Sequence, residues 1–313
     1  MGSTESVFLA DLCNLLDGSA KVAIQTFTAE EWTPAPDSQV DREMRAEVMG
    51  RAGVPWDRTP RDTAFTHATL PLYAAAENLG SIADLVKPPM TMFGAFILAR
   101  ASIEGSARSW WMLDPALDIE DRVHRGVRER WAVVCERISL LEEMEPGELR
   151  SDPAAADMVA EYDRNLAKAA VRKQDVLDTA WNLRVPIHRK DGVVIGVDVQ
   201  RPASSKVVGD LLAAVGFRIG AGLYSWLSQL NHSSASSLSE FFQTGREVSP
   251  DVYEWRPEVP ASLLQNVLHV TLLAFLEAFD RLVFLYGWDD GPWSSWRTHV
   301  KKKIVTGPRV QVQ

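Results

Sequence analysis

The strongest constraint on the fold is a succession of long segments with helical hydrophobic periodicity, which begins at Asp62 and continues to residue 286. Proline-centred connections separate these segments, and proline ends a helix because it has no backbone N–H and its ring clashes with the preceding turn. The sequence therefore predicts an all-α fold, a multi-helix bundle. The expected helices are 62–86, 91–113, 118–145, 154–184, 205–232 and 261–286, preceded by a short N-terminal helix and an exposed amphipathic helix at 37–53.

One segment, DGVVIGVDVQ at residues 191–200, has the signature of extended backbone instead. Asp-Gly favours a tight turn, and the β-branched residues that follow favour a strand. We therefore expect at most one short β-hairpin, or an extended loop, near 192–200.

Composition does not divide the chain into separate domains. It has 313 residues, of which 46% are hydrophobic and 24% charged, enough to bury a large core. We expect an N-terminal helical arm packed on the core at 1–60, a helical-bundle domain at 61–290 and a basic C-terminal tail at 291–313. The tail carries five basic residues and no acidic one, which suits a solvated end or contact with an acidic partner or nucleic acid.

Charge and cysteine content narrow the class of protein. A net charge of −9 argues against a nucleic-acid-binding surface over the whole chain. Cys13 and Cys135 are too few and too far apart for a disulfide framework or a cysteine-rich zinc site, so a reducing, cytoplasmic location is expected. No run reaches the roughly 18 uncharged apolar residues of a membrane span, so we expect no contact with a membrane.

The 91–113 segment carries two charges in the middle of its apolar stripe, at Arg100 and Glu104. A buried charge without a partner costs several kcal/mol, so opposite charges at i and i+4 must pair with each other or with another group. One interpretation is a buried ion pair that sets the helix register. The other is a polar pocket inside the bundle.

The 205–232 segment brings a second set of polar residues. Tyr224, Ser228 and His232 recur every four residues, so their side chains can face one shared space. A neutral histidine can transfer a proton near pH 7, with tyrosine and serine as hydrogen-bonding companions. A histidine at a helix C-terminus also serves as a capping residue, and both interpretations stay open.

Three arginines are candidates for anion binding. Arg122 and Arg125 lie at i and i+3 on one helix face, where they can grip a phosphate or carboxylate, although acidic neighbours also allow a salt-bridged solvent face. Arg201 precedes the start of the 205–232 helix, whose free backbone amides can bind an anion or form an ordinary N-cap.

Several common catalytic motifs are absent from the sequence. There is no ExxH, HExxH, GxxxxGK[ST], GxSxG or GxGxxG, which argues against di-iron, metalloprotease, P-loop, hydrolase and dinucleotide-binding proteins. We therefore expect neither a metal nor a cofactor.

Four segments, LARASIEGSARSWWMLDP, EDRVHRGVRERW, RPASSKVVGDLL and YSWLSQLNHSS, together resemble an uncharacterised all-helical bacterial family that is common in actinobacteria. That family is marked by an LxRxxxE helix and a later YxxLSxxxHxS helix, and the resemblance covers about residues 62–290. The matching positions are Leu98, Arg100 and Glu104, then Tyr224, Leu227, Ser228, His232 and Ser234.

The family is in turn similar to HEPN-type helical bundles, many of which are RNA-cleaving toxins or defence proteins. HEPN nucleases carry an arginine and a histidine separated by four to six residues on a late helix. Here thirteen residues separate Arg218 from His232, and the spacing is met only by Arg61 and His67 in another part of the chain.

Two functional hypotheses follow. In the first, Arg100, Glu104, Tyr224, Ser228 and His232 form a metal-independent endoribonuclease site of a toxin or defence system. His232 would move a proton, Arg100 would stabilise the anionic transition state and Glu104 would orient either of them. In the second, the protein is a non-catalytic module or sensor that binds a protein or a small anion, and the Arg–Glu pair is structural.

The C-terminal aromatic residues bear on oligomeric state. Trp288, Trp293 and Trp296 cluster near the C-terminal end of the sequence. Aromatic residues at a chain end often pack against another subunit, which predicts a homodimer, but they also complete cores.

Overall fold

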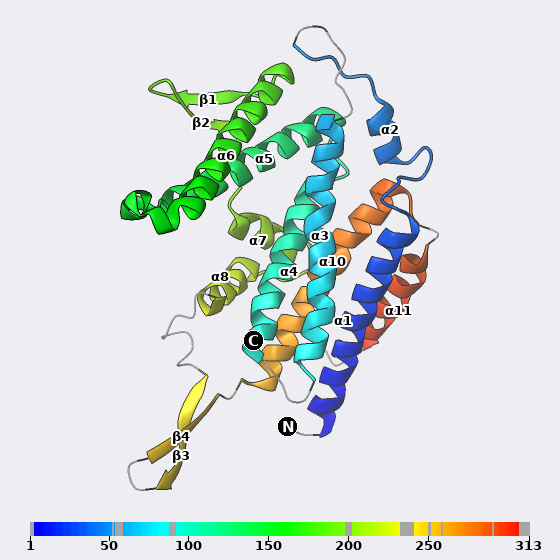
Figure 1. The fold of residues 1–313 in the computed structure, drawn as a ribbon. Helices are drawn as coiled ribbons and strands as arrows, with labels where there is room; N and C mark the ends of the chain where they lie inside the picture. Colours follow the sequence, from blue (N-terminus) through cyan, green and yellow to red (C-terminus); the bar gives the residue numbers. More distant parts are fainter. Residues whose placement is uncertain are drawn as a thin grey trace. The chain divides into compact units, whose positions relative to one another are not determined.

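The computed structural model describes residues 3–51, 53, 59–87, 92–197, 202–231, 241–249, 252–257, 259–289 and 291–306, and Figure 1 shows its ribbon. Helices dominate this part of the chain, so the predicted all-α fold is confirmed. The α-helices are α1 (Ser3–Ala29), α2 (Gln39–Arg45), α3 (Thr59–Leu85), α4 (Met92–Met112), α5 (Ile119–Glu143), α6 (Ala156–Asn182), α7 (Ser204–Ala214), α8 (Gly220–Asn231), α10 (Ala261–Tyr286) and α11 (Pro292–Thr306).

The chain forms two compact units. Unit 1 comprises Met1–Asp41, Ala68–Pro115 and Ala203–Gln313, and unit 2 comprises Arg42–His67 and Ala116–Pro202. This division differs from the predicted 1–60, 61–290 and 291–313. Within unit 2, Glu43 pairs with Arg122 of the 116–202 segment, a contact that a survey of composition along the chain cannot detect.

Unit 1 is built around α10, the most apolar of its helices. α10 contacts α4, α1 and α7, and α11 packs along α1, as Figure 1 shows. Leu268, Leu272, Phe275, Phe279 and Leu282 are all fully buried, because α10 has apolar residues around most of its circumference.

The basic tail predicted for 291–313 is largely a packed helix. Trp293 and Val300 of α11 are buried, and Trp296 donates a hydrogen bond to Ser19 Oγ at 3.0 Å. Trp288 is buried as well, so Trp288 and Trp293 complete the core of unit 1. The homodimer stays a prediction, now without these two side chains to support it.

The helix expected at 205–232 is two helices, α7 and α8. Gly216 has φ +89°, a left-handed conformation that glycine adopts without a steric cost, and it ends the first helix. α7 and α8 then pack against each other, with the backbone at Gly220 lying against Leu212. Ile219, in the connection between the two helices, is exposed.

Two antiparallel hairpins interrupt the helices. β1 (Ile187–Lys190) pairs with β2 (Val193–Val197) around the Asp191-Gly192 turn, as the sequence predicts. β3 (Phe242–Ser249) pairs with β4 (Val252–Pro257), so the expectation of at most one hairpin is wrong.

Two other boundaries also differ from the sequence prediction. The N-terminal helix is not short, since α1 has 27 residues. The amphipathic helix at 37–53 is confined to Gln39–Arg45. Among the described residues, no helix has the length and apolar character required to cross a membrane.

A close contact between α3 and α4 sets the position of the α4 face that carries the charged pair. A Cβ atom at Gly105 would lie 2.6 Å from the Pro71 carbonyl oxygen, and Ser102 Oγ donates to the Ala75 carbonyl at 3.2 Å. Glycine at 105 therefore permits the two backbones to approach at this crossing.

We predict that Gly105→Ala destabilises unit 1 by about 1–3 kcal/mol, because overpacking against a backbone oxygen outweighs the better helix propensity of alanine. Urea denaturation would measure it. Gly222→Ala on α8 is the control: nothing lies within 4 Å of its Cβ position, so that variant should gain up to about 1 kcal/mol. Unchanged stability of Gly105→Ala would contradict the close contact.

Candidate functional site

The predicted Arg100–Glu104 pair exists, and it belongs to a larger cluster on α4. Arg100 Nη2 lies 3.6 Å from Glu104 Oε2, and Arg108 Nη2 lies 2.9 Å from Glu104 Oε1. The three residues follow one another at i, i+4 and i+8, so each ion pair spans one turn of the helix.

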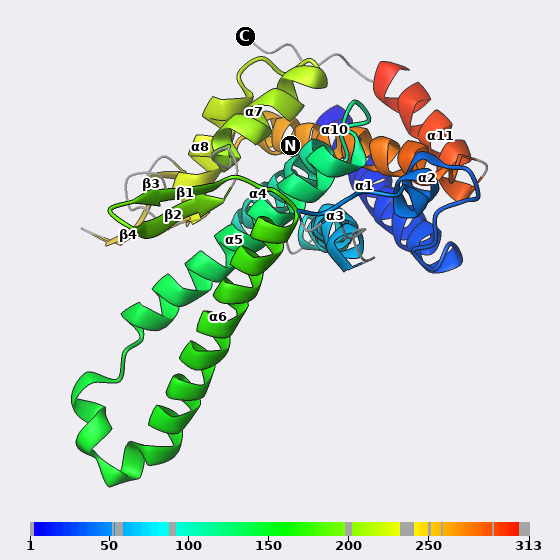
Figure 2. The same ribbon diagram turned by 90° about the horizontal axis from the view of Figure 1, so that it is seen from above.

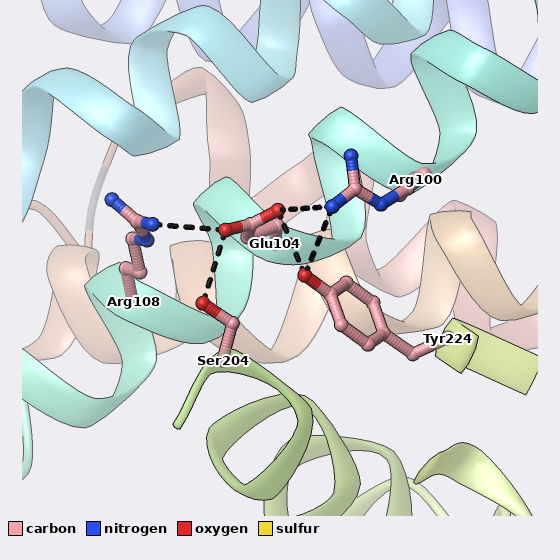
Figure 3. A network of polar contacts seen from close by, with 5 residues as sticks. All are labelled: Arg100, Glu104, Arg108, Ser204 and Tyr224. Carbon is pink, nitrogen blue, oxygen red and sulfur yellow. Dashed lines mark hydrogen bonds and ion pairs between the residues drawn. The ribbon is translucent and has the colours of Figure 1, made fainter. Parts of the chain in front are cut away.

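Two hydroxyl groups from unit 1 complete the cluster, as Figure 3 shows. Ser204, the first residue of α7, donates to Glu104 Oε1 at 3.1 Å. Tyr224 of α8 donates to Glu104 Oε2 at 3.1 Å and accepts from Arg100 Nη2 at 3.2 Å. The carboxylate of Glu104 therefore links α4 to the beginning of α7 and the middle of α8.

The cluster is only partly withdrawn from water. The side chains of Arg100, Glu104 and Arg108 are 21%, 20% and 34% exposed, whereas Tyr224 is buried. The apolar stripe of α4 is also buried unevenly: Phe96 and Ala107 are buried, whereas Ile97 is exposed. α4 presents this face to α7 and α8, which are short and cover it incompletely.

The surroundings of Glu104 favour its ionised form. Burial alone would raise the pKa of this carboxyl, but Arg108, the hydrogen bonds from Tyr224 and Ser204, and Arg100 together lower it below its usual range. Both oxygens are already engaged by these partners. Glu104 is therefore a permanent anion at neutral pH and has little capacity to accept a proton from a substrate.

The two guanidinium groups keep donors that the cluster does not use. Within the cluster, Arg100 and Arg108 contact their partners through Nη2, and Figure 3 shows the other terminal nitrogen of each turned away from Glu104. The Nε atoms of both arginines are buried without a hydrogen-bond partner. With two cations and one anion, the cluster carries a net charge of +1.

The other two predicted members of the site, Ser228 and His232, are not seen in the cluster. Ser228 lies one turn beyond Tyr224 on α8, partly buried, and among the described residues it has no hydrogen bond to Glu104 or Arg100. His232 directly follows α8 and lies outside the described residues. Of the five residues proposed as catalytic, the structure thus brings together Arg100, Glu104 and Tyr224.

The predicted role of Arg122 in anion binding is wrong. Its side chain is fully buried in unit 2, where Nε and Nη2 donate to Glu43 Oε2 and Oε1 at 2.8 and 3.2 Å. The guanidinium also lies over the Phe65 ring at 5.5 Å. Burial and the bidentate carboxylate together keep a ligand from this arginine.

The remaining anion-binding candidates are less defined. Arg125 is partly buried on α5, and Arg201 lies outside the described residues. The helix start that Arg201 precedes already has an anion beside it, because the hydroxyl of Ser204 is bound to Glu104.

Arg108 and Ser204 were not among the predicted residues. A glutamate followed by an arginine four residues later is a favourable helix pair, so the spacing of Glu104 and Arg108 contained a usable signal. Ser204 lies one hundred positions from Glu104, and only the tertiary fold brings it there.

Known proteins do not help to identify this site: no protein-family model, curated protein or solved structure matches the chain. Within the described residues, no group of three or more His, Cys, Asp or Glu side chains is arranged to hold a metal ion. The function must therefore be inferred from the geometry of the cluster itself.

We predict that Glu43→Gln destabilises unit 2 by about 3–5 kcal/mol, because it removes the carboxylate from the buried Arg122 guanidinium. Chemical denaturation would measure the change. Asp175→Asn provides the control in the same unit, since it breaks an ion pair with Arg130 at 2.9 Å in which the aspartate is well exposed. Asp175→Asn should lower the free energy of unfolding by less than about 1 kcal/mol. Equal losses in the two variants would show that burial of Arg122 does not determine the cost of removing its partner.

The contribution of Glu104 to the stability of the protein should depend on pH. The lowered pKa of Glu104 means that its contribution to stability is complete above the ordinary glutamate pKa of about 4.3 and is lost as pH falls through the lower folded-state value. Glu104→Gln should cost about 2 kcal/mol near neutral pH, and this difference from wild type should shrink in acid. Denaturation curves of wild type and Glu104→Gln, recorded near neutral pH and in acid, would measure this difference in stability. A difference independent of pH would contradict an ionised Glu104.

Proposed function

We propose that this protein is a non-catalytic binding module for a small oxyanion, such as phosphate or a carboxylate, which Arg100 and Arg108 recognise. The observation that carries the proposal is the saturation of Glu104. Its two oxygens hold two guanidinium groups and two hydroxyls, so the one carboxylate of the cluster acts as an internal counter-ion.

The charge balance supports binding of an anion. Two guanidinium groups face one carboxylate, and the side chains of both arginines remain partly exposed. Guanidinium groups form strong, directional hydrogen bonds to phosphate and carboxylate, and partial burial strengthens such bonds relative to bulk water. An incoming oxyanion would neutralise the remaining positive charge.

The competing hypothesis is metal-independent RNA cleavage, as the resemblance to HEPN-type bundles implies. That chemistry needs a group that accepts a proton beside the arginines. Glu104 is unsuited to this because it is held ionised by four partners, and His232 lies outside the described residues. The geometry therefore favours binding over catalysis.

Titration calorimetry with inorganic phosphate tests the proposal. Arg108→Gln should weaken binding about tenfold or more, in keeping with the 1.5–3 kcal/mol of a charged hydrogen bond. Glu104→Gln should instead strengthen phosphate binding, because it removes the competing internal anion. A purely structural role for the cluster would not produce these opposite changes.

The matched control is Arg164→Gln, which removes an exposed arginine paired with Glu161 on α6 and should leave phosphate binding unchanged. Absence of phosphate binding by the wild type at millimolar concentration would refute the proposal. So would degradation of RNA by the wild type that is lost in His232→Ala while the variant remains folded, which would establish the nuclease instead.

A further inference from the structure

The closed end of the α5–α6 hairpin in unit 2 has properties that the anion site does not explain. Figure 2 shows α5 and α6 as the two arms of a long hairpin. Two short 3-10 helices, η1 (Gly147–Ser151) and η2 (Pro153–Ala155), connect them. We refer to residues 138–163 as the hairpin tip.

The hairpin tip holds most of the protein's excess negative charge. It contains eight acidic residues and one basic residue, a net charge of −7 against −9 for the entire chain. Some of these carboxylates are paired, since Arg150 binds Asp163 at 3.1 Å and Glu145 at 3.8 Å. Others are exposed and take part in no ion pair among the described residues, namely Glu142, Glu143, Glu148 and Asp157.

Large apolar side chains are exposed in the same segment. Met144 and Met158 are 62% and 51% exposed, and Leu140 and Leu149 are exposed as well. Leu140 lies in the last turn of α5, and Met144, the C-cap of that helix, follows it four residues later. Exposed methionine and leucine side chains among carboxylates are a feature of surfaces that bind other proteins, because the flexible thioether adapts to its partner.

The tip is held in place without these exposed residues. Leu141 is buried between the arms, and Arg150 of η1 binds Asp163 of α6 through both terminal nitrogens. Further along the hairpin, Ala169 and Val176 of α6 are buried. Exposed side chains at the tip can therefore be substituted with little effect on the fold.

We propose that the hairpin tip is a docking surface for a cationic amphipathic helix of another protein. The apolar face of such a helix would cover Leu140, Met144 and Met158, and its lysines and arginines would meet the unpaired carboxylates. Nucleic acid does not fit, because its phosphates would be repelled by a surface of net charge −7.

The basic helix of a second copy does not fit either. α11 carries Lys301, Lys302 and Lys303, but its apolar residues Trp293 and Val300 are already buried in unit 1. Among its described residues, α11 therefore offers no large apolar side chain that is exposed. The occupant is a separate protein whose basic helix is amphipathic.

The test uses a fluorescent model peptide of leucine and lysine with helical periodicity, and its binding to the full chain is followed by anisotropy. Charge reversal by Glu142→Lys should weaken binding at least about fivefold, and Met144→Ser should weaken it to a similar degree. A peptide of the same composition with alternating leucine and lysine should bind more weakly than the helical one.

Two matched variants lie away from the tip. Glu77→Lys changes the net charge equally at an exposed position of α3, and Val171→Ser removes an exposed apolar side chain from the middle of α6. Both should bind the peptide as the wild type does. The proposal fails if the wild type does not bind at micromolar concentration, if the two peptides bind equally, or if Glu77→Lys weakens binding as much as Glu142→Lys.

Discussion

The ionised carboxylate of Glu104 is the interaction on which the arrangement of α4, α7 and α8 depends. A carboxylate that is mostly removed from water must replace its hydration with donors, and here they come from three helices: Arg100 and Arg108 of α4, Ser204 of α7 and Tyr224 of α8. Such a group orders its surroundings, because each partner has to reach it. The same saturation makes Glu104 a poor base and leaves a surplus cation, and the proposal of oxyanion binding depends on both.

Unit 2 also contains a buried charge, but that charge is compensated differently. Arg122 is fully buried and holds one carboxylate, Glu43, in a bidentate pair. Every charge of that pair is compensated, so nothing remains for a ligand. The difference between this structural pair and the candidate site is the surplus guanidinium beside Glu104.

The charge on the surface of the protein is also distributed unevenly. The hairpin tip, residues 138–163, holds a net charge of −7, so the rest of the chain is close to neutral despite several basic segments. An acidic, partly apolar end on a long helical hairpin and a small cationic cluster in unit 1 suit two different ligands. We infer a protein that binds an oxyanion at one position and a basic helix at another.

Helical periodicity and proline spacing in the sequence determined the all-α fold and located α10, because these local properties decide where a helix can form and where it must stop. The i, i+4 spacing was also sufficient to pair Arg100 with Glu104. Only the tertiary structure decided the break at Gly216, the contribution of Ser204, the burial of Arg122 and the division into two units. Each of these depends on which distant segments pack together, and a single sequence carries no direct record of such contacts.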